Sequence, residues 1–172
     1  LTCHLGSKPT WRKDIAAFVP GYKLPAGMVA AGAACGTMTI AAALKEGHNA
    51  GTGAATDLGF STTKTAALSA EDEHVGVSPF WYVDAQVTRA WLDMQNDVTV
   101  KDVRLSYQEG FRSVEHLKRY TTLGMATDQG KTANVPAIAV LAECSGKSIA
   151  ETGTTVFRPP YTPIPIGALA GR

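Results

Sequence analysis

Apolar side chains between residues 98 and 146 recur at helical spacing and predict a compact three-helix unit. Thr99 and Asp102 resemble a capping box at the start of the first helix, and Gly110 would end that helix. Ser113 would cap the second helix, whose apolar residues fall on one side. The sequence therefore predicts helices that begin at capping hydroxyls and end at glycines.

The third helix of this unit is expected to begin near Asp128 or Gln129 and to end at Gly146. Gly124 would stop the helix before it. Pro136 lies inside the third helix, where it should kink the helix or delay its regular start to that residue. A long polar turn would then connect the second helix to the third.

The first half of the chain has a different pattern, which predicts an α/β arrangement. The apolar run from Met28 to Ala34 is bounded by glycine, as in a strand buried on both faces of a parallel sheet. Helical spacing of alanine and leucine begins after Gly36. A strand, a tight turn and a helix N-terminus favour a phosphate, against which we place Gly32, Gly36 and Thr37. Because AGAACG is not the pattern GxGxxG, close backbone packing is the simpler interpretation of these glycines.

Charge and hydropathy exclude two classes of partner. The 172 residues include 16 basic and 15 acidic side chains, so no basic excess points to nucleic acid. No apolar run is long enough to span a bilayer, so we expect no membrane partner.

Cysteine and histidine usage argues against a metal site. The 3 cysteines and 4 histidines share no CxxC, HxH or HExxH spacing, and free thiols are typical of a reducing compartment such as the cytoplasm. The chain begins at Leu1 without a signal peptide, so we expect a processed piece or an excised fragment of a longer protein.

The stretch KRYTTLGMATDQGKTAN, residues 118–134, is the densest group of cations, hydroxyls and amides. Backbone N–H groups and cations where one helix ends and the next begins would cradle an anion. The candidate contacts are Lys118, Arg119, Thr121, Thr122, Gln129, Lys131 and Thr132. The alternative is an ordinary polar turn with Asp128 as the N-cap, but the set contains more polar groups than a turn needs.

Two long motifs give the chain a family resemblance. EGFRSVEHLKRYTTLGMATDQGK and ETGTTVFRPPYTPIPIGALAG strongly resemble the alpha subunit of heterotetrameric sarcosine oxidase. The segment MVAAGAACGTMTIAAALKEGHNAG looks like the end of that subunit's two-dinucleotide-binding domain. The resemblance covers nearly the whole chain but only a middle slice of the subunit, which is several times longer.

This resemblance implies four regions. Residues 1–60 would be the end of a dinucleotide-binding domain, and 61–97 a linker and docking segment. Residues 98–150 would be the three-helix domain, and 151–172 a proline-rich connection toward a folate-binding domain that is not in this chain.

The resemblance also implies a reaction and its cofactors. Sarcosine would be oxidatively demethylated to glycine, giving 5,10-methylenetetrahydrofolate and hydrogen peroxide. The alpha subunit would carry NAD and share FMN with the beta subunit at their interface. The catalytic flavin (FAD) and the folate would lie in other parts of a complex that also contains gamma and delta subunits.

Carried onto this sequence, the resemblance places NAD near Gly32, Ala33, Gly36 and Thr37. The interface FMN is assigned to the seven polar candidates of residues 118–132. Nothing in this chain resembles a catalytic acid, base or nucleophile, so we expect the chemistry to lie in the partner chain and in the folate domain.

The three-helix unit is also similar to the small [2Fe–2S] domain of bacterioferritin-associated ferredoxin and of related amine and proline dehydrogenase subunits. In that pattern, CxC and GMGxCQGxxC supply four thiolates. The corresponding positions here are Asp93, Gln95, Asp128 and Ala133, and none carries sulfur. We therefore expect a scaffold that is kept without its cluster and a loop that contacts the interface flavin instead.

Two other functions remain open. In one, the three helices form a non-catalytic docking module that only joins subunits. In the other, the chain belongs to a related amine or opine dehydrogenase with a different substrate. Docking needs apolar anchors, whereas a flavin phosphate needs cations and hydroxyls, which favours the cofactor interpretation.

Overall fold

The computed structural model describes residues 2–62, 66, 68–71, 73–84, 89–156 and 161–170. The chain forms two compact units, one essentially His4–Ser78 and the other essentially Pro79–Arg172. Their boundary falls inside the predicted linker 61–97. Parts of that linker and of the predicted connection 151–172 lie outside the described residues.

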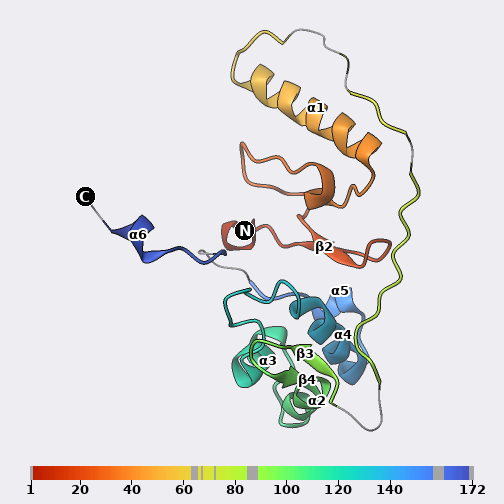
Figure 1. Cartoon of the computed structure of the whole chain (residues 1–172), viewed down its shortest axis with the longest axis vertical. Helices are drawn as coiled ribbons and strands as arrows, with labels where there is room; N and C mark the ends of the chain where they lie inside the picture. Colours follow the sequence, from red (N-terminus) through yellow and green to blue (C-terminus); the bar gives the residue numbers. More distant parts are fainter. Residues whose placement is uncertain are drawn as a thin grey trace. The chain divides into compact units, whose positions relative to one another are not determined.

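The first unit contains a β-hairpin and one long helix (Figure 1). A 3₁₀ turn, η1 (Thr2–Leu5), precedes the antiparallel strands β1 (Thr10–Arg12) and β2 (Ala17–Val19). A second 3₁₀ turn, η2 (Gly32–Cys35), leads to α1 (Ile40–Asp57). The predicted helix after Gly36 is thus confirmed, while the hairpin has no counterpart in the sequence prediction.

The strand predicted for residues 28–34 is wrong. Residues 28–31 are irregular, and the chain then enters η2. Gly32 has φ +66°, a left-handed conformation that cannot continue a strand. Its N–H donates to the side chain of Glu46 in α1 rather than to a neighbouring strand. A parallel strand needs ladder partners, and the described part of this unit has only the β1–β2 pair.

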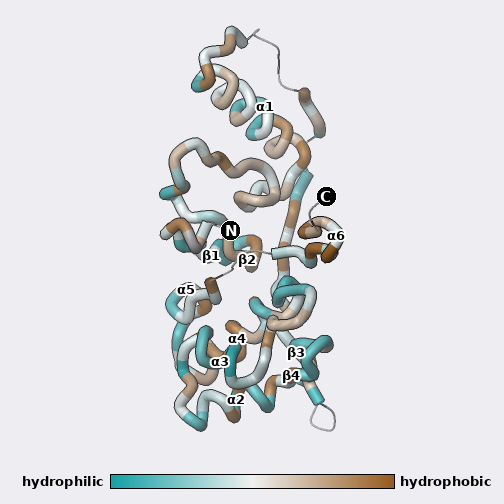
Figure 2. Tube along the Cα trace, turned by 90° about the vertical axis from the view of Figure 1, so that its left-hand side faces the viewer, coloured by the Kyte–Doolittle hydropathy of each residue, from teal (hydrophilic) through white to brown (hydrophobic). Residues whose placement is uncertain are grey.

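Helix α1 contributes no buried side chain to the first unit, although it is 18 residues long. Its sequence is rich in alanine and glycine, and its tube is mostly pale in the hydropathy colouring of Figure 2. None of the described helices is both long enough and apolar enough to span a bilayer.

The second unit holds the core of the chain. Strands β3 (Trp91–Asp93) and β4 (Val98–Thr99) pair antiparallel with an irregular register. They are followed by α2 (Val100–Gln108), α3 (Val114–Thr121) and α4 (Asn134–Ser145). Two single-turn helices, α5 (Ile149–Thr152) and α6 (Ile166–Leu169), complete it. The predicted three-helix arrangement is confirmed.

Local capping explains where these helices begin. The Thr99 hydroxyl accepts from the N–H of Asp102, whose carboxylate accepts in return from the N–H of Thr99. The hydroxyl of Ser113 accepts from the N–H of His116 at the start of α3. Both caps match the sequence prediction.

The predicted ends of the α3–α4 turn are wrong by several residues. Helix α3 ends at Thr121, before Gly124, because Thr122 turns left-handed at φ 62°. Helix α4 begins at Asn134 rather than at Asp128 or Gln129. Within the turn, the N–H groups of Gly124, Asp128 and Gly130 donate to side-chain oxygens and so do not extend either helix. Pro136 is the third residue of α4, a position where a helix needs no N–H donor.

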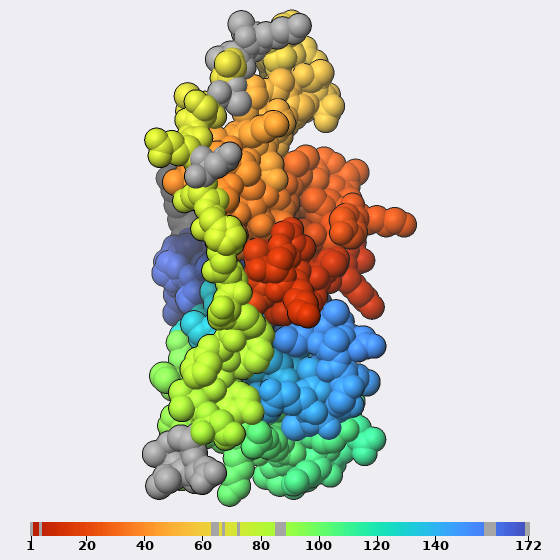
Figure 3. All heavy atoms as spheres, turned by 90° about the vertical axis from the view of Figure 1, so that its right-hand side faces the viewer, coloured from red at the N-terminus to blue at the C-terminus, as the bar shows by residue number. Residues whose placement is uncertain are grey.

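Helix α4 is the centre of the apolar core, and its residues 137–142 are all buried. It packs against α2, and fully buried side chains such as Leu117 of α3 and Val103 of α2 complete the core. Residues 73–84 form no helix or strand and run in an extended course, as the yellow-green atoms of Figure 3 show.

The turn before α4 is packed on the side chain of Asn134. That side chain is buried, and a Cβ added at Gly130 would collide with its amide group. Gly110 also has a positive φ, but a Cβ there would meet nothing within 4 Å. A comparison of substitutions at the two glycines therefore separates the effect of steric packing from that of backbone conformation.

We expect Gly130→Ala to destabilise the α4 region by about 2–4 kcal/mol, since it combines left-handed strain with overpacking. Gly110→Ala should cost only about 1–2 kcal/mol, from the backbone alone. Native-state hydrogen exchange of the α4 amides measures both effects. Equal losses in the two variants would show that the Asn134 contact is unimportant.

Candidate functional site

A buried carboxylate, Asp93 at the end of β3, organises the polar end of the second unit. Its side chain is 2% exposed. Its Oδ1 accepts from the N–H groups of Gln95 and Asn96, at 2.9 and 3.1 Å. Its Oδ2 accepts from the N–H of Gly124, at 2.8 Å. Asp93 therefore ties the β3–β4 turn to the turn that follows α3.

The side chains of Gln95 and Asn96 extend this connection. The Oε1 atom of Gln95 accepts from the hydroxyl of Thr127 and from the N–H of Asp128, at 3.2 and 3.3 Å. The Nδ2 of Asn96 donates to the carbonyl of Thr122 at 2.7 Å. Two turns that are about thirty residues apart in sequence are thus held together by oxygen acceptors and amide donors.

Asp128 shapes the turn itself and does not cap α4, because the residue at the cap position is Ala133. Its Oδ1 accepts from the N–H of Gly130 at 3.1 Å, and its Oδ2 from the hydroxyl of Thr132 at 2.9 Å. These hydrogen bonds, led by that from Gly130, hold the pKa of Asp128 below its ordinary value. The carboxylate is thereby kept ionised and bound to its own loop.

The four positions that correspond to cluster ligands do not fit a thiolate-bound [2Fe–2S] centre. Asp93, Gln95 and Asp128 present oxygens that already accept hydrogen bonds. Ala133 is fully buried and has no donor atom. Among the residues that the structure describes, no three His, Cys, Asp or Glu side chains are grouped to hold a metal ion.

A pocket of about 230 Å³ lies beside this turn, against α3. Three of the predicted contacts line it, Lys118, Arg119 and Gln129, together with Glu115, Met125, Val156 and Tyr161. Arg119 donates from Nη1 to the Glu115 carboxylate at 2.9 Å. Lys118 is half-buried and forms no hydrogen bond or ion pair with any described residue.

Glu115 is an ionised acid within this pocket. Burial raises its pKa, but the hydrogen bond from the N–H of Val156 and the charges of Arg119 and Lys118 outweigh that effect and leave the pKa below its ordinary value. The pocket therefore holds two cations and one carboxylate, which leaves a net positive charge for an anionic group.

The other four predicted contacts are engaged in their own turn. Thr121 donates to the carbonyl of Leu117, Thr122 to that of Thr121, and Thr132 to Asp128. The Nζ of Lys131 donates to the carbonyls of Asp128 and Tyr161, at 3.1 and 2.9 Å, and lies 4.0 Å from the centre of the Tyr161 ring. Lys131 thus fastens the segment after residue 160 to the turn, and the structure does not bring it into the 230 Å³ pocket.

The glycine turn of the first unit is arranged around Glu46 of α1. The N–H of Gly32 and the hydroxyl of Thr37 donate to its two carboxylate oxygens, at 2.9 and 2.6 Å. The Cys35 thiol donates to the same carboxylate at 3.3 Å. These bonds, led by that from Thr37, lower the pKa of Glu46.

Ala33 and Gly36 have backbone roles in this turn. The carbonyl of Ala33 accepts from the N–H of Gly36 at 3.1 Å. Gly36 has φ +90°, and a Cβ there would lie 2.8 Å from Ile15 and 3.1 Å from Val19. Gly36 is therefore required for close packing. This is the simpler of the two interpretations of these glycines given by the sequence analysis.

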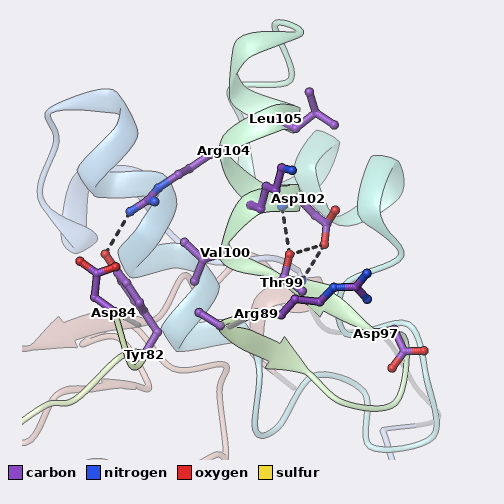
Figure 4. A pocket seen from close by; sticks show the side chains of 11 residues that line it. Tyr82, Asp84, Arg89, Asp97, Thr99, Val100, Asp102, Arg104 and Leu105 are labelled. Atoms are coloured by element: carbon purple, nitrogen blue, oxygen red, sulfur yellow. Dashed lines mark hydrogen bonds between the residues drawn. The ribbon is translucent and has the colours of Figure 1, made fainter. Parts of the chain in front are cut away.

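A larger pocket, of about 590 Å³, lies at the start of α2 and is not predicted by any motif of the sequence. Figure 4 shows it between the segment of Tyr82, the β3–β4 hairpin and α2. Arg104 donates to the Tyr82 hydroxyl at 3.2 Å, and that hydroxyl donates to Glu143 at 3.1 Å. The residues that line this pocket carry charges of both signs and come from three separate segments of the chain. A motif in the linear sequence therefore cannot reveal the pocket.

Comparisons with known sequences agree on one class, the subunits of sarcosine oxidases. The model of the sarcosine oxidase A3 domain matches residues 87–172. The alpha subunits of sarcosine oxidase from Rhizobium meliloti (strain 1021) and Corynebacterium sp. (strain P-1) are 44% and 40% identical to this chain, over 99% and 96% of it. The chain belongs to the sarcosine oxidase alpha-subunit family.

The matched region is only part of those relatives, since the chain spans 17% and 18% of their lengths. The fold is also similar to that of L-proline dehydrogenase from P. horikoshii, with a TM-score of 0.73. That match covers 99% of this chain and 36% of the other, at 21% sequence identity, so it shows the fold alone.

Replacing Asp93 tests the organising role of its carboxylate. Asp93→Asn removes one acceptor oxygen and places an NH₂ group against backbone donors, so we expect a loss of about 3 kcal/mol in local stability. Hydrogen exchange at Gly124 and in α4 measures it. The control is Asp97→Asn, since Asp97 is exposed and left-handed at φ 54°, which asparagine tolerates. If both variants exchange like the unmodified protein, Asp93 does not organise the turn.

Proposed function

We propose that this chain is part of the alpha subunit of a sarcosine oxidase and that it holds cofactors and partner subunits rather than catalytic groups. The complete enzyme would oxidatively demethylate sarcosine to glycine, giving 5,10-methylenetetrahydrofolate and hydrogen peroxide. The alpha-subunit relatives that match almost all of this chain support this assignment.

The observation that carries the cofactor role is the uncommitted Lys118 ammonium in the 230 Å³ pocket. Its charge faces the carboxylate of Glu115, but no described residue accepts a hydrogen bond from it, so its N–H donors are available to a bound anion. Arg119 uses only Nη1 in its contacts with Glu115, so its other nitrogens remain able to donate. We propose that this pair binds the phosphate of FMN, with Gln129 beside it.

The size of the pocket supports a shared cofactor. Sites for whole small molecules usually have volumes of roughly 300–1,000 Å³. At about 230 Å³ this pocket is smaller, so it suits one end of a cofactor. The remainder of FMN would be covered by the beta subunit. When bound, FMN supplies electron transfer, and the residues of this chain supply charge and position.

Thr121, Thr122, Lys131 and Thr132 would then support the site indirectly. Each is bonded within the turn, and Lys131 also holds Tyr161, whose side chain lines the pocket. Their role would be to fix the shape of the wall that Gln129 and Met125 present to the cofactor.

For NAD, we propose the turn of Gly32, Ala33, Gly36 and Thr37, completed by other parts of the alpha subunit. FAD and folate would bind elsewhere in the complex.

A docking role is the second candidate and is compatible with the first. Phe80, Val83 and Met94 expose 76%, 61% and 81% of their surface. Phe80 and Val83 are within two residues of Tyr82, which lines the mixed-charge pocket of Figure 4. Exposed apolar side chains beside paired charges are typical of protein interfaces. We propose that the surface formed by Phe80, Val83 and Met94 contacts another subunit, and that this subunit is the beta subunit. The gamma and delta subunits would complete the complex.

Lys118→Met tests the flavin site in the complete complex. Loss of a charge-assisted contact to phosphate should weaken FMN retention about 10- to 100-fold, because Met keeps the length of the side chain but not the charge. The measurement is FMN released per complex during dilution, followed by fluorescence.

Lys147→Met is the matched control, because Lys147 is an exposed lysine of the same unit and lines none of the pockets described above. FMN retention that is unchanged in both variants would exclude Lys118 from the site and leave the docking role as the better account. Equal losses in both would point to a general charge effect rather than to this pocket.

A further inference from the structure

A carboxylate lies on the wall of the pocket that we assign to the flavin phosphate. Glu115 lines this 230 Å³ pocket together with Lys118 and Arg119, the two cations that would hold an anion. Among the described residues that line the pocket, Tyr161 is the only other titratable side chain. An ionised acid beside a doubly charged phosphate is unfavourable, because like charges repel. A pocket that only attracts anions has no use for this acid.

Glu115 is held by two hydrogen bonds and keeps acceptor capacity. Its Oε1 accepts from the N–H of Val156, and its Oε2 accepts from Nη1 of Arg119, both at 2.9 Å. A carboxylate offers about four acceptor sites, so about two remain for another donor. The side chain is 34% exposed, which leaves those sites accessible. Glu115 can therefore accept a hydrogen bond from a ligand in the pocket that it lines.

Glu115 stays ionised over the pH range in which a phosphate ester changes its charge. Burial raises the pKa of Glu115, but the hydrogen bond from Val156 and the charges of Arg119 and Lys118 leave this pKa below its ordinary value. A phosphate monoester loses its second proton near pH 6, and its charge then changes from one negative unit to two. Between pH 6 and pH 8 a fixed carboxylate thus meets a ligand whose charge increases.

We propose that the pocket selects the singly charged, protonated form of the FMN phosphate, whose hydroxyl donates to the Glu115 carboxylate while Lys118 and Arg119 bind its other oxygens. This selection rests on the proposed binding of FMN at the pocket. The doubly charged form has the same shape but no proton to donate, and its extra charge would lie beside Glu115. Specificity of this kind needs a repulsive element as well as attractive ones. Glu115 therefore makes FMN binding weaker as the pH rises.

The alternative is that Glu115 only positions Arg119 and the backbone at Val156. The two roles differ in the sign of one effect above pH 7. If Glu115 repels the doubly charged phosphate, Glu115→Gln strengthens FMN binding at pH 8. If Glu115 only orients Arg119, the same variant loses that ion pair and weakens FMN binding at every pH.

The experiment measures the dissociation constants of FMN and of riboflavin, which lacks the phosphate, between pH 6 and pH 8. Equilibrium dialysis is performed on the complete complex after its FMN has been removed. For the unmodified protein we expect FMN binding to weaken about 50-fold from pH 6 to pH 8, because about half of the phosphate is protonated at pH 6 and about 1% at pH 8. Riboflavin binding should be nearly independent of pH.

The variant Glu115→Gln should lose most of this pH dependence. We expect its FMN binding to change less than about 5-fold over the same range and to be about 10-fold tighter than that of the unmodified protein at pH 8, since the repulsion is removed. Hydrogen exchange of the Val156 N–H shows whether the amide oxygen of the variant still accepts this bond.

Glu109→Gln is the matched control. Glu109 also accepts a hydrogen bond in the same unit, from the hydroxyl of Tyr120 at 2.6 Å, and it does not line the pocket. This variant should keep the pH dependence of the unmodified protein.

FMN binding that is independent of pH in the unmodified protein would overturn the selection of the protonated form, whatever the stability of the variants. So would the same pH dependence for riboflavin, an unchanged pH dependence in Glu115→Gln, or weaker FMN binding by that variant at pH 8. Equal affinities for FMN and riboflavin at every pH would show that the phosphate is not held. That result would overturn the proposed flavin site itself, and this inference with it.

Discussion

The second unit depends on one buried anion, the carboxylate of Asp93. It accepts three backbone N–H bonds from two turns that are far apart in sequence. Without such an acceptor these donors would be buried and unpaired, which is costly. By accepting these hydrogen bonds, the carboxylate joins two loops at one end of a small helical unit. A metal cluster bound by thiolates from both loops would join them in a similar way. Gln95 and Asp128 extend the same arrangement along the α3–α4 turn.

This arrangement explains why most polar groups of residues 118–134 are bonded within their own turn. Much of this stretch, including Thr121, Thr132 and Lys131, stabilises its own turn. What remains available is Lys118, with part of Arg119 and Gln129, at one small pocket. A rigid turn that presents a few uncommitted charges is a suitable wall for a cofactor shared with another chain. In the first unit, Glu46 also joins a turn to a helix, since its carboxylate accepts from Gly32 and Thr37.

Elements set by local interactions could be predicted from the sequence. The capping box of Thr99 and Asp102 and the Ser113 cap involve residues three apart, so their spacing was sufficient. The apolar run 28–34 does not form the predicted strand, because small apolar residues suit several conformations and the hydrogen bond from Gly32 to Glu46 selects a turn. The late start of α4 follows from side chain-to-backbone bonds within the turn. Glu46, Glu115 and the pocket of Figure 4 depend on contacts across the fold, which no spacing along the chain encodes.

Oxygen acceptors on Asp93 and Gln95, and not thiolates, join the two turns at the polar end of the second unit. Analysis of iron and acid-labile sulfide in the complete protein, isolated with its partner chains and under conditions that preserve clusters, tests this most directly. We expect no iron or sulfide in stoichiometric amount, alongside a flavin absorbance spectrum. Iron and sulfide at two atoms each per alpha subunit, abolished by Asp93→Ala and Asp128→Ala, would contradict this.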